Sequence, residues 1–332
     1  MKLGIHQLDQ YYSGTAPDWR AALRTALSRN RIAFTLLRTT VPPTVKQIAL
    51  FENTIPQLCL SSGVYRTTYR GRFRNFDPLL NERLAERFGR SAPLRIEDWA
   101  ASDCLASSEW TASLFPMFPL ATLTASDLTL FLIEVCVPDG STYIMEANGE
   151  LLQYIQPPFV IRLNPPESRF LPVNSLLERG ARSRFRPLKQ SWRIPSEWLN
   201  SECPEVFEQP PFVFRKIPLI HPEAHALRVS CSRFAIRRHS VFESSDGLPD
   251  VIRTMNIFNH SYFSKERMLE GARAVAQSLR EGGLWIVGRT MQENPPVHHA
   301  SLLVREKDGF RLIERFGPGS EIEELVVTGL PA

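Results

Sequence analysis

Cysteine pairs and metal-ligand spacings are missing from this 332-residue chain. Its cysteines lie at positions Cys59, Cys104, Cys136, Cys203 and Cys231, without a Cys-x-x-Cys pair or a Cys/His ligand pattern. An odd number of unpatterned cysteines is typical of a reducing compartment and speaks against a zinc site. We therefore expect no bound metal and a cytoplasmic protein.

Long hydrophobic runs, a signal peptide and internal repeats are also missing. No run approaches the ~18 apolar residues of a membrane span, and the N-terminal residues MKLGIHQLDQYY have no signal-peptide core. The formal charge of +4 is a modest excess, which does not by itself indicate nucleic acid. With 43% hydrophobic and 22% charged residues, the chain is typical of a globular protein of one large domain or two, without a membrane partner.

The most informative stretch runs from Leu94 to Leu128. It predicts a strand over Leu94–Trp99, a turn of small residues over Ala100–Cys104, a helix to about Phe115, and a strand over Thr122–Ser126 that ends on Asp127. Open α/β sheets hold nucleotide-like ligands with such a unit. The turn lets the backbone approach the ligand, the helix N-terminus is partly positive, and the acid accepts hydrogen bonds from both ribose hydroxyls.

The preceding residues, 1–93, are expected to be mainly helical, with a first helix capped by Asp18 and another helix over residues 44–60. Between them and the informative stretch, Val64–Phe76 alternates aromatic residues with arginines. One interpretation is a contact with an anion or nucleic acid, because arginine and aromatic side chains suit phosphates and bases. The other, which we favour, is an amphipathic segment whose arginines face water.

After Asp127 the pattern indicates antiparallel strands with turns at residues 138–140 and 148–149. We interpret Leu130–Leu219 as an insertion in the sheet, because it holds too many large apolar residues to stay solvated. Regular α/β patterning then returns. A helix capped by Ser264 ends at residues 282–283, a continuous apolar strand LWIVGRT follows, and a hairpin turns across residues 307–309.

These last elements resemble the second half of a class I, Rossmann-like, S-adenosyl-L-methionine (SAM)-dependent methyltransferase. The helix end LREGG with the strand LWIVGRT is similar to that superfamily's LRPGG signature, and the hairpin is similar to its reversed last strand. PDVIRTMNIFNHSYFS is similar to the fourth motif, with features of the CheR-type protein methyltransferases. The resemblance covers residues 94–128 and 221–317.

The resemblance implies an α/β fold: a Rossmann-like, seven-stranded, mostly parallel sheet with an antiparallel last strand, plus an N-terminal helical region and an α+β insertion. The domains implied are a helical region over 1–93 and a SAM-binding domain over 94–332. The latter contains 130–219 as an inserted substrate or lid subdomain. The activity implied is in-line transfer of the SAM methyl group to a small-molecule or peptide/protein acceptor, with S-adenosyl-L-homocysteine as product.

Two alternatives remain open at this point. A catalytically degenerate SAM-fold binding or scaffold protein is one, because the turn over Ala100–Cys104 has no glycine where the family has two or three. An RNA methyltransferase is the other, although nucleic acid is an unlikely partner on the overall charge. A homodimer is possible, because the apolar insertion can pair subunits as readily as it covers a cleft.

The resemblance also implies site residues. Asp127 binds the ribose, Asp98 and Asp103 orient the methionine ammonium group, and Ser240 stands where an acid often binds the adenine. The full set for the cofactor is Asp98, Ala100, Ser102, Asp103, Asp127, Leu128, Ser240, Val241, Asn256 and Phe258; the catalytic set is Asn256, Asn259 and Tyr262; no residue is expected to bind metal. One of His298 and His299 is a candidate general base, but an inert surface pair is the interpretation we favour.

Overall fold

The computed structural model describes residues 32–38, 42–63, 65–157, 159–164, 172–200, 205–291, 293 and 295–328. Most of the helix expected after Asp18 lies outside these residues, and its described end is a short 3-10 helix, η1 (Phe34–Leu37). The chain divides into two compact units. The inserted unit comprises the described residues up to Thr67 and Phe131–Pro222, and the sheet unit comprises Thr68–Leu130 and the described residues from Glu223 onward.

These units divide the chain differently from the boundaries expected at residues 94, 130 and 219. Residues 68–93 belong to the sheet unit, because α4 (Asp77–Phe88) packs against α5 (Leu105–Met117). The described residues up to Thr67 join the insertion, because η1 and α3 (Val45–Thr54) share a hydrophobic cluster with its strands. The described residues up to Thr67 and the insertion therefore build one core together.

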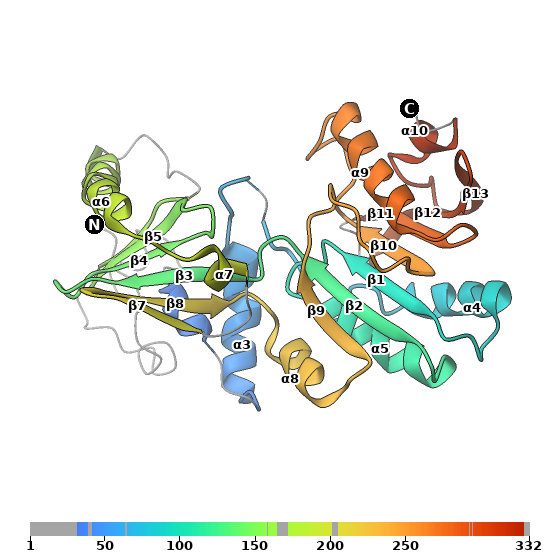
Figure 1. Ribbon diagram of the computed structural model, residues 1–332, viewed down its shortest axis with the longest axis horizontal. Helices are drawn as coiled ribbons and strands as arrows, with labels where there is room; N and C mark the ends of the chain where they lie inside the picture. The colour runs from blue at the N-terminus through green and yellow to red at the C-terminus, as the bar shows by residue number, and fades with distance from the viewer. Residues whose placement is uncertain are drawn as a thin grey trace. The chain divides into compact units, whose positions relative to one another are not determined.

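The sheet unit contains a seven-stranded sheet in the order β13-β12-β11-β10-β1-β2-β9 (Figure 1). Its strands are β1 (Arg95–Trp99), β2 (Thr122–Asp127), β9 (Phe234–Arg238), β10 (Val251–Met255), β11 (Leu284–Met291), β12 (Val297–Glu306) and β13 (Gly309–Phe316). The five strands from β9 to β11 are parallel, in the 3-2-1-4-5 order of the doubly wound fold. The expected Rossmann-like fold class is confirmed.

The hairpin at the end of the sheet is also confirmed, with one difference in detail. β12 runs antiparallel to β11, and β13 runs antiparallel to β12. The reversed strand is therefore the first strand of the hairpin, while the edge strand β13 returns to the direction of the parallel strands. Two strands joined by a turn as short as residues 307–308 must run in opposite directions, which fixes this arrangement.

Helices α8 (Pro222–Ser230), α9 (Lys265–Ser278) and α10 (Glu323–Val327) complete the sheet unit. The Ser264 hydroxyl accepts a hydrogen bond from the Arg267 amide and caps α9, as the sequence predicts. α9 contributes Met268 and Val275 to a core that also contains Trp285 and Phe310. The buried Trp285 joins β11 to this helix layer.

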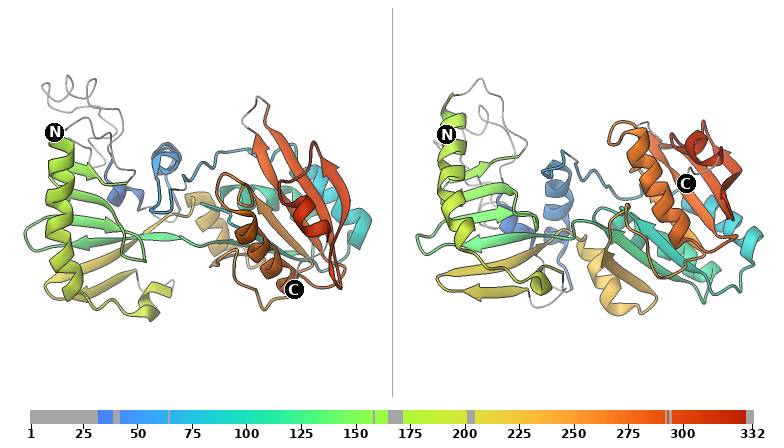
Figure 2. Two further views of the ribbon diagram at one scale, coloured as in Figure 1. Left: turned by 90° about the horizontal axis from the view of Figure 1, so that it is seen from above. Right: turned by 45° about the horizontal axis from the view of Figure 1, so that its top comes forward.

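The inserted unit contains a six-stranded antiparallel sheet in the order β6-β5-β4-β3-β8-β7. The strands are β3 (Phe131–Cys136), β4 (Thr142–Met145), β5 (Leu151–Gln156), β6 (Phe159–Arg162), β7 (Val206–Gln209) and β8 (Phe212–Pro218); its other helices are η2 (Ile55–Gln57), α6 (Pro172–Ser191) and α7 (Ser196–Asn200). Alternate strand residues face opposite sides, so the sheet has two cores. Figure 2 shows α6 running along one side of this sheet.

Both turns expected in this sheet are confirmed, because Gly140 and Gly149 adopt the positive φ angles that glycine allows. Of the helices that the structure describes, none combines the length and the apolar character needed to cross a membrane.

Candidate active site

The loop that follows β1 has an unusual backbone. Ala100 (φ 56°), Ser102 (φ 58°) and Cys104 (φ 63°) are all left-handed. This conformation costs an L-residue roughly 1–2 kcal/mol, whereas glycine adopts it freely. The loop therefore has the positive φ angles that glycine allows, although it is built from three small residues other than glycine at alternate positions. Strained backbone that persists at one place is a pointer to function.

Hydrogen bonds to β2 hold this loop in place. The Ala101 amide donates to the Ser126 carbonyl oxygen at 2.8 Å, and the Ser102 amide donates to Asp127 Oδ2 at 2.8 Å. Asp127 Oδ1 accepts a second backbone amide, that of Thr129, at 3.0 Å. The carboxylate thus stands at the end of β2, partly exposed, where the sequence predicts it. Leu128 beside it is 53% exposed, which leaves an apolar surface next to the acid.

At the N-terminus of α5, Asp103 is buried and its Oδ1 accepts the Leu105 amide at 3.1 Å. The N-cap of α5 is Cys104, so this bond forms a turn just before the helix and is not a side-chain cap. The charge of Asp103 also favours the protonated form of the nearby Arg72 guanidinium. Asp103 therefore acts on the loop through a hydrogen bond and on Arg72 through its charge.

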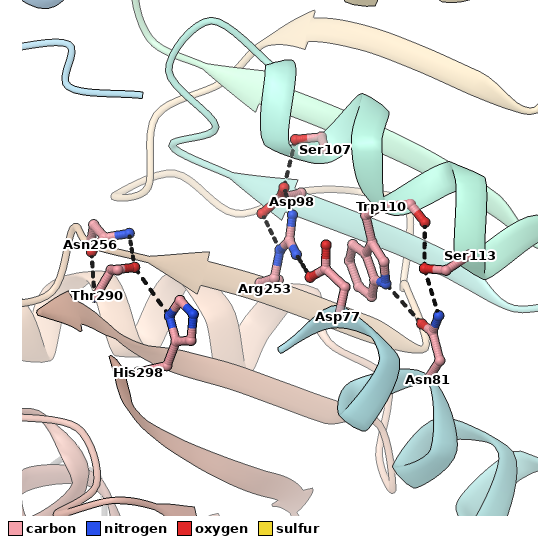
Figure 3. Close-up of polar contacts among 10 residues, drawn as sticks. All are labelled: Asp77, Asn81, Asp98, Ser107, Trp110, Ser113, Arg253, Asn256, Thr290 and His298. Atoms are coloured by element: carbon pink, nitrogen blue, oxygen red, sulfur yellow. Dashed lines mark hydrogen bonds and ion pairs between the residues drawn. The ribbon is translucent and has the colours of Figure 1, made fainter. Parts of the chain in front are cut away.

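Asp98 has a different environment from the one the resemblance implies. It lies in β1, buried, with both oxygens engaged: Arg253 Nε donates to Oδ1 at 2.9 Å, and the Ser107 hydroxyl donates to Oδ2 at 2.6 Å (Figure 3). Arg253 also donates to Oδ2 of Asp98 and to Oδ1 of Asp77, the latter at 2.8 Å. A fully buried guanidinium on β10 requires these carboxylates, so Asp98 holds Arg253 rather than facing a ligand.

Two aromatic rings also pack against the Arg253 guanidinium. Its guanidinium carbon lies 4.1 Å from the centre of the Trp110 ring and 5.1 Å from that of Phe73. Burial raises the pKa of Asp77 to about 7, although the charge of Arg253 acts to lower it. Burial acts to lower the pKa of Arg253, but Asp98 and Asp77 outweigh it, so that pKa is raised. This ionic cluster ties β1, β10 and the start of α4 together.

A second polar cluster lies where β10 and β11 end. Asn256 has a left-handed backbone (φ 65°), its Oδ1 accepts the Thr290 amide at 2.7 Å, and its Nδ2 donates to Thr290 Oγ1 at 3.4 Å. The same hydroxyl lies 3.3 Å from His298 Nδ1 and accepts from Arg72 Nε at 3.3 Å (Figure 3 shows the first three residues). Thr290 therefore joins a predicted catalytic residue to a histidine and an arginine.

His298 is more constrained than a surface histidine. Its ring stacks on Phe76, with 4.8 Å between ring centroids and 25° between planes. Burial, and then the charges of Arg72 and Arg253, lower the pKa of His298 to about 4. At neutral pH the imidazole is therefore neutral and has a lone pair that can accept a proton. The inert surface pair that we favoured from the sequence does not describe this residue.

The favoured interpretation, in which the arginines of Val64–Phe76 face water, does not hold for all of them. Arg66 is 3% exposed and Arg72 is partly buried. Burial lowers the pKa of Arg72, while Tyr69, Tyr262 and Asp103 act to raise it. Arg72 thereby lies beside the predicted residue Tyr262, which is itself 44% exposed. The sequence signal for Arg72 was present in the alternation of arginine and aromatic residues.

Four predicted residues have mainly structural contacts. Phe258 is 2% exposed and packs under α9, where a Cβ on Gly271 would lie 2.3 Å from its ring. Asn259 closes a turn, since its Nδ2 donates to the Asn256 and Ile257 carbonyls and its Oδ1 accepts the Ser261 amide. Val241 is buried in the same core as Phe258, and the Ser240 hydroxyl accepts the Phe242 amide at 3.3 Å. Phe258 therefore supports the strand end instead of stacking on a ligand.

Metal ligands do not gather at this site. Among the described residues, no group of three or more His, Cys, Asp or Glu side chains has the geometry to hold a metal ion.

The left-handed loop residues give a stability prediction. Ala100→Gly should stabilise the protein by about 0.5–1 kcal/mol, because removal of Cβ relieves the αL strain by more than the added freedom of the unfolded chain. Ala101→Gly is the matched control: its φ is not positive, so the same change should destabilise by about 0.5–1 kcal/mol. Urea unfolding of both variants measures the difference. Equal effects would contradict the left-handed backbone at residue 100.

Comparisons with known proteins were made for family, sequence and structure. No family model matches the chain, and no curated protein sequence matches it. Among solved structures, a sugar N-methyltransferase from a Streptoalloteichus species is 12% identical, with 77% of this chain and 78% of that chain covered and a TM-score of 0.32. The SAM-bound amino pentose methyltransferase from Micromonospora echinaspora is 11% identical, with 74% and 70% covered and a TM-score of 0.29.

A putative sarcosine dimethylglycine methyltransferase from Galdieria sulphuraria is 11% identical at a TM-score of 0.29, and the match spans 65% of this chain but only 45% of that protein. At such TM-scores the likeness carries no functional argument. The fold follows from the chain's own strand order, and it is a Rossmann-like, doubly wound α/β fold.

Proposed function

We propose that this protein is a SAM-dependent methyltransferase whose cofactor binds at the C-terminal edge of the seven-stranded sheet. The observation that carries the proposal is the loop after β1, with left-handed residues at 100, 102 and 104 and the Ser102 amide bonded to Asp127. Hydrogen bonds to β2 hold the three strained residues in place, and strained backbone of this kind clusters at sites where a ligand approaches the backbone closely.

The residues around Asp127 fit a nucleoside. His239, which follows β9, packs its ring 4.4 Å from that of Trp99, and its buried Nε2 has no hydrogen-bond partner among the described residues. The His239 amide donates to the Asp127 carbonyl oxygen at 3.2 Å, so the two residues are neighbours. A buried polar atom, a carboxylate and the exposed Leu128 together offer partners for polar groups and for an apolar ring face.

We assign cofactor roles accordingly. Asp127 accepts hydrogen bonds from the ribose hydroxyls, the loop Ala100–Cys104 holds the methionine end, and Asp103 attracts its ammonium group. Leu128 and the residues after β9, Ser240 and Val241, border the adenine. Asp98 acts indirectly, because it positions β1 and β10 through Arg253.

The polar cluster at the ends of β10 and β11 is the proposed acceptor site. SAM supplies an activated methyl group on a sulfonium, so the protein has mainly to orient the acceptor and exclude water. Asn256 and Tyr262 position the acceptor, and Arg72 holds a negatively charged or polar part of it. The Thr290 hydroxyl accepts from Asn256 and Arg72, so its hydrogen is donated to His298 Nδ1. Nε2 of the neutral imidazole then carries the ring hydrogen, and we assign it to donate a hydrogen bond to the acceptor.

The acceptor is proposed to be a small molecule or a peptide. The identity of the acceptor is tested by exchanging acceptors, not by cofactor affinity.

Calorimetric titration of the full-length protein with SAM and with S-adenosyl-L-homocysteine tests the proposal. We expect one site per chain with micromolar affinity for both ligands. Absence of heat with either ligand at millimolar concentration would refute the cofactor site. The degenerate fold without a SAM site would then be the correct description of the sheet unit.

A further inference from the structure

The outer helix of the inserted unit carries a row of positive charges. Arg179, Arg182, Arg186 and Lys189 lie on α6, and Arg193 follows it. Their spacing of three and four residues places those on the helix along one face. With Arg184 the segment 179–193 has six cations and no acidic residue. The formal charge of the whole chain is only +4, so the average conceals a strongly basic surface.

Another face of α6 is packed in the hydrophobic core of the inserted unit. Leu177, Ala181, Phe185 and Leu188 belong to the hydrophobic cluster on one side of the six-stranded sheet, together with Trp192 just beyond the helix. Because α6 has its apolar face in this core, it has no such face to insert into a lipid bilayer. The cations of the row lie off this buried face: four of them are exposed and Arg182 is partly buried.

The row also lines a hollow of about 520 Å³. One wall is the turn between β4 and β5, Gly149–Leu151, and the other consists of Arg182, Arg186 and Lys189 on α6. Lys189 Nζ donates to the Gly149 carbonyl oxygen at 2.9 Å, which fixes one edge. Three cationic side chains around one hollow, with Glu150 as the only carboxylate among the described residues that line it, favour an anionic occupant.

The cations of this row bond to carbonyl oxygens instead of carboxylates. Arg182 donates to the Leu163 carbonyl at 3.1 Å and Arg193 to the Gln190 carbonyl at 3.4 Å. Within the described part of the chain, no carboxylate lies at ion-pair distance from the cations of 179–193. Arginines of the sheet unit differ: Arg83 pairs with Glu314, and Arg289 pairs with Glu321.

We propose that this row binds the phosphate backbone of a nucleic acid. Four of these cations, Arg179 to Lys189, extend about 15 Å along α6, and Arg193 continues the row beyond the helix end. A row of this length matches a polymer with regularly repeated anions better than a single small anion. Four of the five are arginines, whose planar guanidinium binds phosphate oxygens in pairs. The inference goes beyond methyl transfer and does not depend on it. It also revises the expectation, drawn from overall charge, that nucleic acid is an unlikely partner.

Fluorescence anisotropy of a labelled 20-nucleotide single-stranded RNA, titrated with the full-length protein, tests the proposal. The variant Arg182→Gln/Arg186→Gln/Lys189→Gln should bind at least tenfold more weakly. For this variant the slope of log K against log salt concentration should become less steep by about 2, because three contacts are lost and each phosphate contact contributes roughly 0.7 for a single strand. Arg182 and Lys189 also bond within the protein, so their loss can affect folding. A second variant, Arg179→Gln/Arg186→Gln, changes two exposed positions. It should fold normally and bind RNA several-fold more weakly.

The matched control removes the same charge elsewhere. Arg90, Arg267 and Arg311 are exposed arginines of the sheet unit, each paired with a glutamate, and their combined change to glutamine should leave RNA affinity within twofold. An equal loss in this control would show a net-charge effect and overturn the assignment. So would unchanged binding in the α6 variants, or competition by polyglutamate as strong as that by unlabelled RNA. SAM titration of the same variants should be unchanged, so failure here is distinguishable from failure of the proposed activity.

Discussion

Arg253→Met is expected to destabilise the protein by about 3–5 kcal/mol, the usual effect of removing one partner from a buried ionic cluster. Arg253 is fully buried and makes three hydrogen bonds to Asp98 and Asp77. Methionine fills a similar volume but leaves two carboxylates in the core without their counter-charge. Urea unfolding at neutral pH measures the loss as a lower midpoint at a similar slope.

The matched control is Arg280→Met. Arg280 pairs with Asp250, but its side chain is 43% exposed. Water replaces the lost partner there, so we expect an effect under about 1 kcal/mol. Equal destabilisation by the two changes would contradict the burial of the Arg253 cluster.

The loss in free energy of unfolding caused by Arg253→Met should also depend on pH. Burial already raises the pKa of Asp77 in the folded protein to about 7, and removal of Arg253, which lowers it, raises it further. The folded state then holds protons that the unfolded state has released, so stability falls as pH rises above the unfolded pKa of about 4. The variant should therefore lose more stability at pH 8 than at pH 6. A deficit that grows as pH falls would contradict this account.

The mostly parallel sheet could be predicted from the sequence because its elements depend on patterns that are local. A buried apolar strand, a capped helix ending in Gly282-Gly283 and a Lys-Asp-Gly turn each carry their own signal. The resemblance then placed these elements in one seven-stranded sheet. The unit boundaries could not be predicted in this way, since the packing of α3 against β3 and β5 joins residues that lie about 80 or more positions apart.

The site residues show the same contrast between properties that are local in the sequence and properties that depend on distant residues. Asp127 ends a strand, which is a local property, and the structure has it there. Asp98 lies one residue before the end of β1, but its role depends on Arg253, a charged residue inside an apolar run 155 positions away. An arginine within a buried strand is itself a signal, because it demands buried carboxylates. Asp98 and Asp77 are the acids that satisfy it.

The glycine-free loop shows a limit of motif matching. Counting glycines suggests that the loop is degenerate, yet Ala100, Ser102 and Cys104 adopt the left-handed conformation that the glycines would allow. The conformation is imposed by bonds to β2, namely those of the Ala101 and Ser102 amides. Tertiary contacts thus supply what the residue types do not.

Asp127→Ala is expected to weaken SAM binding by at least tenfold. Under the proposed function its carboxylate accepts hydrogen bonds from two ribose hydroxyls. A hydrogen bond to a charged group contributes about 1.5–3 kcal/mol, and a loss of about 1.4 kcal/mol raises the dissociation constant tenfold. The change also frees the Ser102 and Thr129 amides, so about 1–3 kcal/mol of stability should be lost with it. Calorimetric titration at a temperature well below unfolding separates the two effects.

Asp139→Ala provides the matched control for that change. Asp139 also accepts a backbone amide and a hydroxyl, both of Ser141, but it lies in the turn between β3 and β4 of the inserted unit. Its removal should leave SAM affinity within twofold, because only a turn is loosened. If Asp127→Ala folds and binds SAM as the wild type does, the ribose lies elsewhere, and the strained loop after β1 must then serve a ligand that makes no use of the acid beside it.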